Sequence, residues 1–361
     1  MLFRSRAAAR RRPATLTIDA PGARLAIAAV TPGRIATPAS LTTSGQPVPL
    51  PAGDYDVLAT AADGLIIHAP LVLAHGEVLR MALPRLRAAD VPAGFAVIPP
   101  GRFLTGARGE EMFRTTFLGA APLHPRTTPG YLIARDETTY AEWLTYLRSL
   151  PPAERELRRP RTASATPPAM RVDGDGPFTL VWTPGDRPLA APEGSALEYP
   201  GRQRRRQVDW ARLPVSGVSF DDARAYVAWL AATGRVPRAR ICTELEWERA
   251  ARGADGRSFP HGEELAPDDA NFDETYGRVT DAFGPDPVGS HPASDSPFGL
   301  HDMAGNVKEW VLGVDGKPWL RGGGYYKMRT VQLTMNRDAA EPTMRLPWIG
   351  LRVCADLPPG S

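Results

Sequence analysis

The carboxy-terminal part of the chain, from residue 255 to residue 361, contains no helix-period pattern of apolar residues. It shows turns and short strands instead, in a chain that holds 38 Pro and 34 Gly among its 361 residues. Such a segment makes few regular backbone hydrogen bonds, so something else has to hold it in one shape. Bound cations commonly do this. The segment therefore predicts an irregular, loop-rich domain that needs added support.

One stretch of this segment, SPFGLHDMAGNVKEW at residues 296–310, brings two acids, a turn and a tryptophan close together. Asp302 and Glu309 flank a Gly-Asn turn, and Trp310 ends the stretch. The acids either cap a tight corner of the core or surround a cation with their oxygens. Ca²⁺ takes roughly six to eight oxygen ligands, and an irregular loop can aim backbone carbonyls inward as well as carboxylates.

The amino-terminal part, residues 14–83, has short alternating strands separated by turns. The strand-like runs are TLTIDA, RLAIAAV, YDVLATA, LIIHAPLVL and VLRMALP. They predict a small antiparallel β-sandwich of about 70 residues, which we assign to residues 14–85. Its hairpin sequence, PLPAGDYDVLATA, resembles the PEGA-like modules of bacterial surface and signalling proteins.

From residue 92 to residue 356 the pattern mixes strands with helices and predicts a second, α+β domain. One helix is expected to begin near Thr138. Two others carry a cap and an acid three residues on, and each ends at a glycine: Ser219 with Asp222 and Gly234, and Thr243 with Glu246 and Gly253. Residues 151–212, rich in Pro and Arg, are interpreted as a long insertion with a few strands.

Composition excludes two classes of partner. The net charge is +3, and Met1–Arg12 alone carries five Arg, so the rest of the chain is close to neutral. A domain-wide field for nucleic acid is therefore not expected. No stretch approaches the roughly 20 apolar residues of a membrane helix. The run Arg202–Arg206 is interpreted as a solvated loop, with a patch for a phosphate or an acidic partner as the alternative.

The ends and the cysteines do not identify a compartment. Residues 1–13 are interpreted as a disordered basic tail or the scar of a truncation, because they lack the apolar core and cleavage site of a signal peptide. Because the opening Leu-Phe-Arg-Ser can also be read from a common sequencing adapter, we expect the true amino terminus to be missing. Cys242 and Cys354 are too few for a disulfide scaffold, and they either pair or stay reduced. A cytoplasmic and a periplasmic or extracellular location in a bacterium both stay open.

Six blocks carry a family signature in their expected order: PVSGVSFDDARAYVAWL, RICTELEWERAARGADGRSFPHGEE, DDANFD, PVGSHPASDSPFGLHDMAGNVKEW, LRGGGYY and IGLRVC. Over about residues 92–356 the chain resembles the formylglycine-generating enzyme family, the sulfatase-modifying factors. The runs VPAGFAVIPPGRFLTG and CTELEWERAARGADGR further resemble the bacterial branch in which this domain follows a Ser/Thr kinase domain. An upstream kinase domain is therefore expected.

The resemblance implies a variant of the C-type lectin fold, α+β with little regular secondary structure and with structural calcium. One implied Ca²⁺ site uses the side chains of Asp302 and Glu309 and the backbone carbonyls of Gly305 and Val307. A second uses the side chains of Asn271 and Asp281 and the carbonyls of Phe272 and Phe283. The alternative is that the first pair of acids only caps turns or pairs with an arginine, such as Arg321 or Arg352.

The catalytic members of this family hold copper with two cysteines that follow a Gly-Gly-Ser-Tyr block, and they oxidise a substrate cysteine to formylglycine. Here the block reads RGGGYYKMRTVQLTMNRDAAEP, without a cysteine. Lys327 and either Val331 or Gln332 stand where the pair is expected. Because soft thiolates suit Cu(I), copper is not expected. Two further departures are His261 and Lys308, each replacing a tryptophan of the family pattern.

A scaffold kept without its copper thiolates predicts a non-catalytic module that binds a ligand, peptide or protein, and no catalytic residue is assigned. Tyr and Arg suit recognition, and the expected ligand groove is lined by Arg321, Tyr325, Tyr326, Lys327, Arg329, Asn336 and Arg337. Alternatively, both tyrosines belong to the core. The second candidate function is an oxidase or oxygenase that acts on a protein cysteine. The third is a structural extracellular module with a Cys242–Cys354 bridge.

Overall fold

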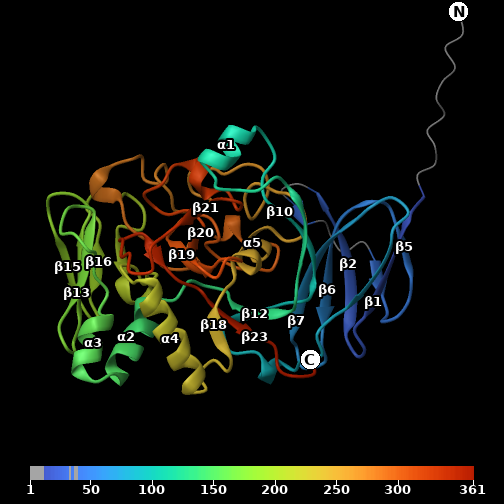
Figure 1. Cartoon of the computed structure of the whole chain (residues 1–361), viewed down its shortest axis with the longest axis horizontal. Coiled ribbons are helices and arrows are strands. Elements are labelled where there is room, and N and C mark those ends of the chain that lie inside the picture. The colour runs from blue at the N-terminus through green and yellow to red at the C-terminus, as the bar shows by residue number, and fades with distance from the viewer. Residues whose placement is uncertain (1–11, 32–33, 36–39) are drawn as a thin grey trace, which may run out of the picture.

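The structure is a computed structural model that describes residues 12–31, 34–35 and 40–361. It places an all-β unit at one end of the molecule and a mixed domain of helices and strands over the rest (Figure 1). The predicted basic tail at residues 1–13 lies almost entirely outside the described residues. Within the described ranges, no helix is long and apolar enough to cross a membrane.

Two sheets form the amino-terminal unit. The first contains β1 (Ala14–Asp19), β5 (Val48–Leu50) and β8 (Val78–Ala82). The second contains β2 (Arg24–Thr31), β3 (Arg34–Ile35), β4 (Ser40–Thr42), β6 (Gly53–Thr60) and β7 (Ile66–Leu73). Side chains alternate between the two faces of a strand, and residues on the inner faces, such as Leu16, Ile27 and Val57, are fully buried in the core.

One strand pair in this unit differs from the predicted antiparallel sandwich. β1 pairs with β8 in parallel, with Leu16 opposite Leu79. A parallel pair needs a long crossover between its strands. Here the intervening strands β2 to β7, most of which form the opposite sheet, provide it.

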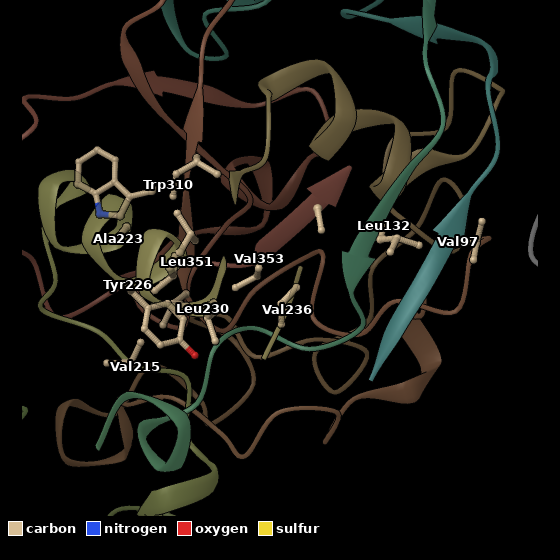
Figure 2. Packing of buried hydrophobic residues seen from close by; sticks show 14 of the residues in the cluster. Val97, Leu132, Val215, Ala223, Tyr226, Leu230, Val236, Trp310, Leu351 and Val353 are labelled. Atoms are coloured by element: carbon tan, nitrogen blue, oxygen red, sulfur yellow. The ribbon is translucent and has the colours of Figure 1, made fainter. Parts of the chain in front are cut away.

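One sheet of the larger domain pairs strands from the beginning, the middle and the end of that domain. The order β18-β23-β12-β9 sets the last strand of the chain between strands from the start and the middle of the domain. Its core includes Val97, Leu132 and Val353 of the sheet, together with Leu230 and Trp310 (Figure 2). The strands are β9 (Phe95–Ile98), β12 (Tyr131–Ala134), β18 (Ala239–Ile241) and β23 (Val353–Asp356).

The three principal helices begin where the sequence predicts caps. Thr139, Ser219 and Thr243 each accept a hydrogen bond from the backbone N–H three residues on, and the acid there accepts one in return. The first cap lies one residue after the predicted Thr138. The helices are α2 (Tyr140–Ser149), α4 (Phe220–Ala232) and α5 (Glu244–Arg252), and Gly234 and Gly253 follow the last two with positive φ.

The insertion at residues 151–212 forms a small unit at the end of the molecule opposite the β-sandwich (Figure 1). Trp182, Tyr199 and Trp210 are buried in it. It contains α3 (Pro152–Arg158), β13 (Ala169–Asp173), β14 (Thr179–Thr183), β15 (Leu189–Pro192), β16 (Ala196–Glu198), β17 (Gln207–Asp209) and the 3₁₀ helix η2 (Trp210–Arg212). The peripheral elements η1 (Ala88–Asp90), β10 (Gly101–Thr105), α1 (Glu111–Thr116) and β11 (His124–Thr128) precede it in the chain.

Residues 255–361, all of which the structure describes, contain no α-helix, as the sequence predicts. They form the sheet β21-β20-β19-β22, short 3₁₀ turns, and loops. The elements are η3 (Thr280–Ala282), η4 (Pro292–Ser294), β19 (Lys308–Leu312), β20 (Pro318–Arg321), η5 (Arg329–Gln332), β21 (Arg337–Ala339) and β22 (Ile349–Gly350). The predicted α+β class with little regular secondary structure is confirmed.

Buried ion pairs and a disulfide support this irregular segment. Arg202, Arg252, Arg321 and Arg352 are each at most 2% exposed, and each pairs with a buried carboxylate. The Cys242–Cys354 disulfide links neighbouring strands β18 and β23. Because buried charges are tolerated only when they are paired and hydrogen-bonded, these contacts specify how the loops pass one another.

Candidate functional site

An aromatic patch on the surface includes part of the exposed region of residues 321–342. We define it by Phe283, Tyr326, Lys327 and Trp348. The Tyr326 ring stacks on Trp348 with centroids 5.4 Å apart, and it meets Phe283 edge to face at 5.3 Å. Lys327 Nζ lies 4.5 Å from the Trp348 centroid, and burial lowers the pKa of this amine. Tyr326 keeps 41% of its surface exposed. The patch can therefore offer a ligand an aromatic face beside a cation.

A buried glutamine holds the loop that presents this patch. Gln332 Oε1 accepts a hydrogen bond from the Gly324 N–H at 3.1 Å, and Nε2 donates to the carbonyls of Lys327 at 2.8 Å and Met328 at 3.2 Å. A side chain at Gly323 would place its Cβ 1.4 Å from Gln332 Oε1, so any larger residue there would displace the Gln332 amide. The amide therefore fixes the shape of residues 323–328 from inside.

The structure corrects the predicted groove at its buried members. Arg321, Tyr325 and Asn336 are each at most 2% exposed, so they belong to the core. Arg321 Nη2 donates to Glu248 at 2.9 Å, and the Tyr325 hydroxyl donates to the Pro347 carbonyl at 3.0 Å. Burial raises the pKa of Tyr325 well above its usual range. Of the two tyrosines, only Tyr326 is available to a ligand.

Two other predicted groove residues, Arg329 and Arg337, lie in different environments. Arg329 is exposed and pairs with Glu274 at 2.6 Å. Arg337 is half-buried, pairs with Glu244 at 3.1 Å and lies over the Trp319 ring at 3.7 Å, so it belongs to a different contact. Trp348, which sequence reasoning missed, completes the patch. Its signal was a large aromatic residue directly before the IGLRVC block.

The first predicted calcium site contains one carboxylate with an unused oxygen. Asp302 is buried, its Oδ2 accepts the Gly289 N–H at 2.7 Å, and its Oδ1 has no hydrogen-bond partner among the described residues. Burial raises the pKa of Asp302 to about 6. Glu309 differs, because Arg352 Nη2 at 2.9 Å and Trp247 Nε1 at 2.6 Å bind its two oxygens. For Glu309 the structure shows the arginine pairing that the sequence had left open.

Sequence reasoning missed a third carboxylate beside this loop. Glu137 is buried, and it accepts hydrogen bonds from Asn306 Nδ2 at 2.7 Å and from the Val307 N–H at 3.1 Å. Burial and the neighbouring Asp302 charge raise the pKa of Glu137 well above its usual range. It lies in the run ARDETTY, far from the loop in sequence, so no local pattern indicated the contact.

The second predicted calcium site has one unused oxygen and several occupied ones. Asn271 is buried, its Nδ2 donates to the Gly284 carbonyl at 3.0 Å, and its Oδ1 has no hydrogen-bond partner in the part of the chain that the structure describes. Asp281 is exposed. The Phe283 carbonyl accepts a hydrogen bond from Trp182 Nε1 at 3.1 Å, and the Phe272 carbonyl accepts one from the Thr275 N–H at 3.1 Å. Among the buried side chains of this site, Asn271 therefore presents the unused oxygen.

A cation from the chain itself lies against the same segment. The Arg202 guanidinium donates to the carbonyls of Ala282 at 2.7 Å and Gly284 at 2.6 Å, and to Asp286 Oδ1 at 2.7 Å. It is fully buried, so neither interpretation of the Arg202–Arg206 run was right for this residue. Backbone carbonyls that could have coordinated a metal ion instead accept hydrogen bonds from Arg202, an arginine of the insertion.

Comparison with known proteins adds the family. A model of the sulfatase-modifying factor enzyme 1-like domain matches residues 82–357. The chain belongs to this family. Because the match covers most of the chain, the resemblance predicted from six sequence blocks is confirmed.

Three relatives of the sulfatase-modifying factor family illustrate its range. The chain is 28% identical to a formylglycine-generating enzyme of Thermomonospora curvata over 63% of this chain and 74% of that protein. It is 36% identical to the inactive C-alpha-formylglycine-generating enzyme 2 of Bos taurus over 37% of this chain and 41% of the bovine protein. It is 40% identical to the serine/threonine-protein kinase pkn1 of Chlamydia caviae over 28% of this chain and 14% of the kinase. The chain therefore spans less than half of the bovine protein and of the kinase.

The residues at the expected copper positions do not fit copper in this family member. Lys327 lies at one position. Gln332 is fully buried at the other, while Val331 lies only half-buried beside it. The two cysteines of the chain are joined to each other between β18 and β23. An amine and an amide that is already hydrogen-bonded do not replace soft thiolates, so we assign no copper-dependent step to this site.

Proposed function

We propose that this sulfatase-modifying factor domain is a non-catalytic binding module that captures a peptide or protein segment on the aromatic patch. The hydrogen bonds of Gln332 support the proposal most directly, because this residue, which with Val331 is a candidate for the second copper position, keeps the loop in shape. Because hydrogen bonds rather than a metal hold this loop, it can keep the aromatic patch in place without copper-dependent oxidation of a cysteine. The kinase-named relative supports a sensor or recruiting role for this domain beside a kinase, as the sequence predicts.

The chemistry of the patch suggests the kind of segment it binds. Tyr326 and Trp348 offer stacked rings to an apolar or aromatic side chain, and Lys327 offers a cation to a carboxylate. The other cation at this edge, Arg329, already pairs with Glu274. We therefore expect a peptide that places one large apolar side chain next to an acidic one.

Substitution on the patch is expected to weaken such binding at least tenfold. Peptides are first selected from a displayed random library against the purified protein, and their affinities are then measured by fluorescence polarisation. Tyr326→Ala removes the exposed ring, and Lys327→Glu reverses the charge. Arg224→Ala, at an exposed position of α4, is the matched control and is expected to leave the affinity unchanged. Selected peptides that bind all four proteins equally would contradict the proposal.

The competing function is the oxidation of a protein cysteine, which a related enzyme of Thermomonospora curvata supports by its name. It requires ligands for a redox metal. The residues at the expected copper positions of this chain provide no thiolate. We therefore place the binding module first.

Calcium at the Asp302 loop is a further part of the proposal, and the unused Asp302 Oδ1 supports it. Asp302 and the carbonyls of Gly305 and Val307 would hold the ion, and its charge would support the loop. Purified protein is expected to contain calcium, and chelation is expected to lower the melting temperature, because a ligand that binds only the folded state stabilises it. Asp302→Asn should remove most of that shift. Metal analysis that finds no calcium, with a melting temperature unaffected by millimolar calcium, would rule this site out.

A further inference from the structure

A cavity of about 300 Å³ lies between the β-sandwich and the larger domain. One wall comes from β6 and β7 of the sandwich, and the other from residues 254–257, 261–263 and 295–297. β7 also contacts β9 and β10 of the larger domain at this junction (Figure 1). Small-molecule sites are commonly of this size or larger, and they favour the junctions between domains.

The lining of this junction cavity is acidic. The described residues that line it provide five carboxylates but only two guanidinium groups, those of Arg108 and Arg257. Arg257 is already committed, because its Nη2 lies 2.7 Å from Asp255 Oδ2. The carboxylates are those of Asp54, Asp56, Asp255, Glu263 and Asp295. The excess negative charge favours a cationic occupant.

Asp56 gives the clearest sign that a partner is missing. It is 6% exposed, and its Oδ2 lies 2.8 Å from His68 Nδ1. Its Oδ1 is buried and makes no hydrogen bond within the described structure. A buried carboxylate oxygen without a donor costs free energy, so such atoms are rare unless a ligand or an ion completes them.

Two further lining residues carry buried atoms without a partner. Asp295 Oδ1 and His261 Nδ1, both on the wall formed by the larger domain, make no hydrogen bond within the described residues. His261 replaces the tryptophan of the family pattern, and the structure places it on this cavity rather than on the aromatic patch. Burial and the nearby Asp255 raise the pKa of Asp54, which agrees with an uncompensated negative charge. Residues with a buried polar atom that lacks a partner among the described residues therefore line the cavity on both walls.

We propose that the junction cavity binds a small organic cation of about amino-acid size, with an ammonium or guanidinium group that donates N–H bonds to the carboxylates of Asp56 and Asp295. Charge-assisted hydrogen bonds of this kind are the strong ones in proteins. A metal ion fits less well, because no group of three or more His, Cys, Asp or Glu side chains in the described residues is placed to hold one. The ligand would bridge the β-sandwich and the larger domain.

Isothermal titration of the full chain with agmatine, putrescine, an Arg-containing tripeptide and calcium chloride tests this proposal. At least one of the two amines is expected to bind with a dissociation constant below 1 mM and to raise the melting temperature. Asp56→Asn and Asp295→Asn should each weaken that binding at least tenfold. Asp186→Asn, at an exposed turn of the insertion far from the cavity, is the control and should leave it unchanged.

If Asp56→Asn does not fold, Asp295→Asn decides, because Asp295 lies nearer the surface. Absence of amine binding up to 10 mM overturns the proposal, as does binding that is insensitive to both substitutions. Binding of calcium alone, or of the tripeptide alone, with loss in the same variants would assign the cavity to another class of ligand. None of these results depends on the aromatic patch, so the proposed function is tested separately.

Discussion

Replacing Arg202 with methionine is expected to lower the free energy of unfolding by about 3–5 kcal/mol. The substitution keeps most of the side-chain volume but leaves the Asp286 carboxylate buried without its closest cation, which lies 2.7 Å away in the native chain. The carbonyls of Ala282 and Gly284 lose their donor as well. Breaking a buried pair by removing one partner is costly because the other charge stays desolvated.

Urea denaturation measures this change through the midpoint and slope of the unfolding curve. Arg204→Met is the matched control, because Arg204 belongs to the same basic run but is exposed and pairs with the exposed Asp268. Surface pairs contribute about 0–1 kcal/mol, so this variant should remain near the native stability. Equal stabilities for the two variants would show that Arg202 does not hold the segment around Asp286.

Removing the Cys242–Cys354 disulfide is expected to cost about 4 kcal/mol of unfolding free energy. The bond closes a loop with a sequence separation of 112, and a crosslink over so long a loop restricts the unfolded chain strongly. It also joins strands from distant parts of the domain, since β18 and β23 are neighbours in the same sheet. The expected result is a large fall in melting temperature for Cys242→Ser/Cys354→Ser.

The native protein in the presence of a reductant provides the control for this variant. Both samples should unfold at the same lower temperature, and alkylation followed by mass measurement should label both cysteines only after reduction. Labelling of both cysteines in the folded, unreduced protein would contradict the disulfide. Unchanged stability in the variant would contradict the estimate of its contribution.

The elements that were predictable from the sequence are those with local signals. The caps at Ser219 and Thr243 follow from a hydroxyl and an acid three residues apart, and the structure contains both. The helix-free segment from residue 255 was predictable for the same reason, because a helix requires a 3.6-residue period over several turns. The family was predictable as well, because its six sequence blocks are local motifs that can be recognised without the structure.

What the sequence missed depends on contacts between distant residues. The Arg202–Asp286 pair joins positions 84 residues apart in the sequence. From composition alone, Arg202 was interpreted as part of a solvated basic run. Tyr325 and Tyr326 illustrate a second limit, since these neighbours in a turn differ in burial and the sequence does not say which of the two is covered. The junction cavity is a third case, because its two walls come from separate domains.

The most direct test of the central claim is an oxidation assay on a Cys-x-Pro-x-Arg peptide. The purified protein is mixed with the peptide, copper and O₂, and the formylglycine-generating enzyme relative from Thermomonospora curvata runs beside it as the positive control. Mass spectrometry then reports whether the peptide cysteine becomes an aldehyde. We expect no conversion by this chain while the control converts its peptide. Conversion by this chain, lost on adding a metal chelator, would contradict the binding-module account and show an oxidase with a metal site outside the expected thiolate positions.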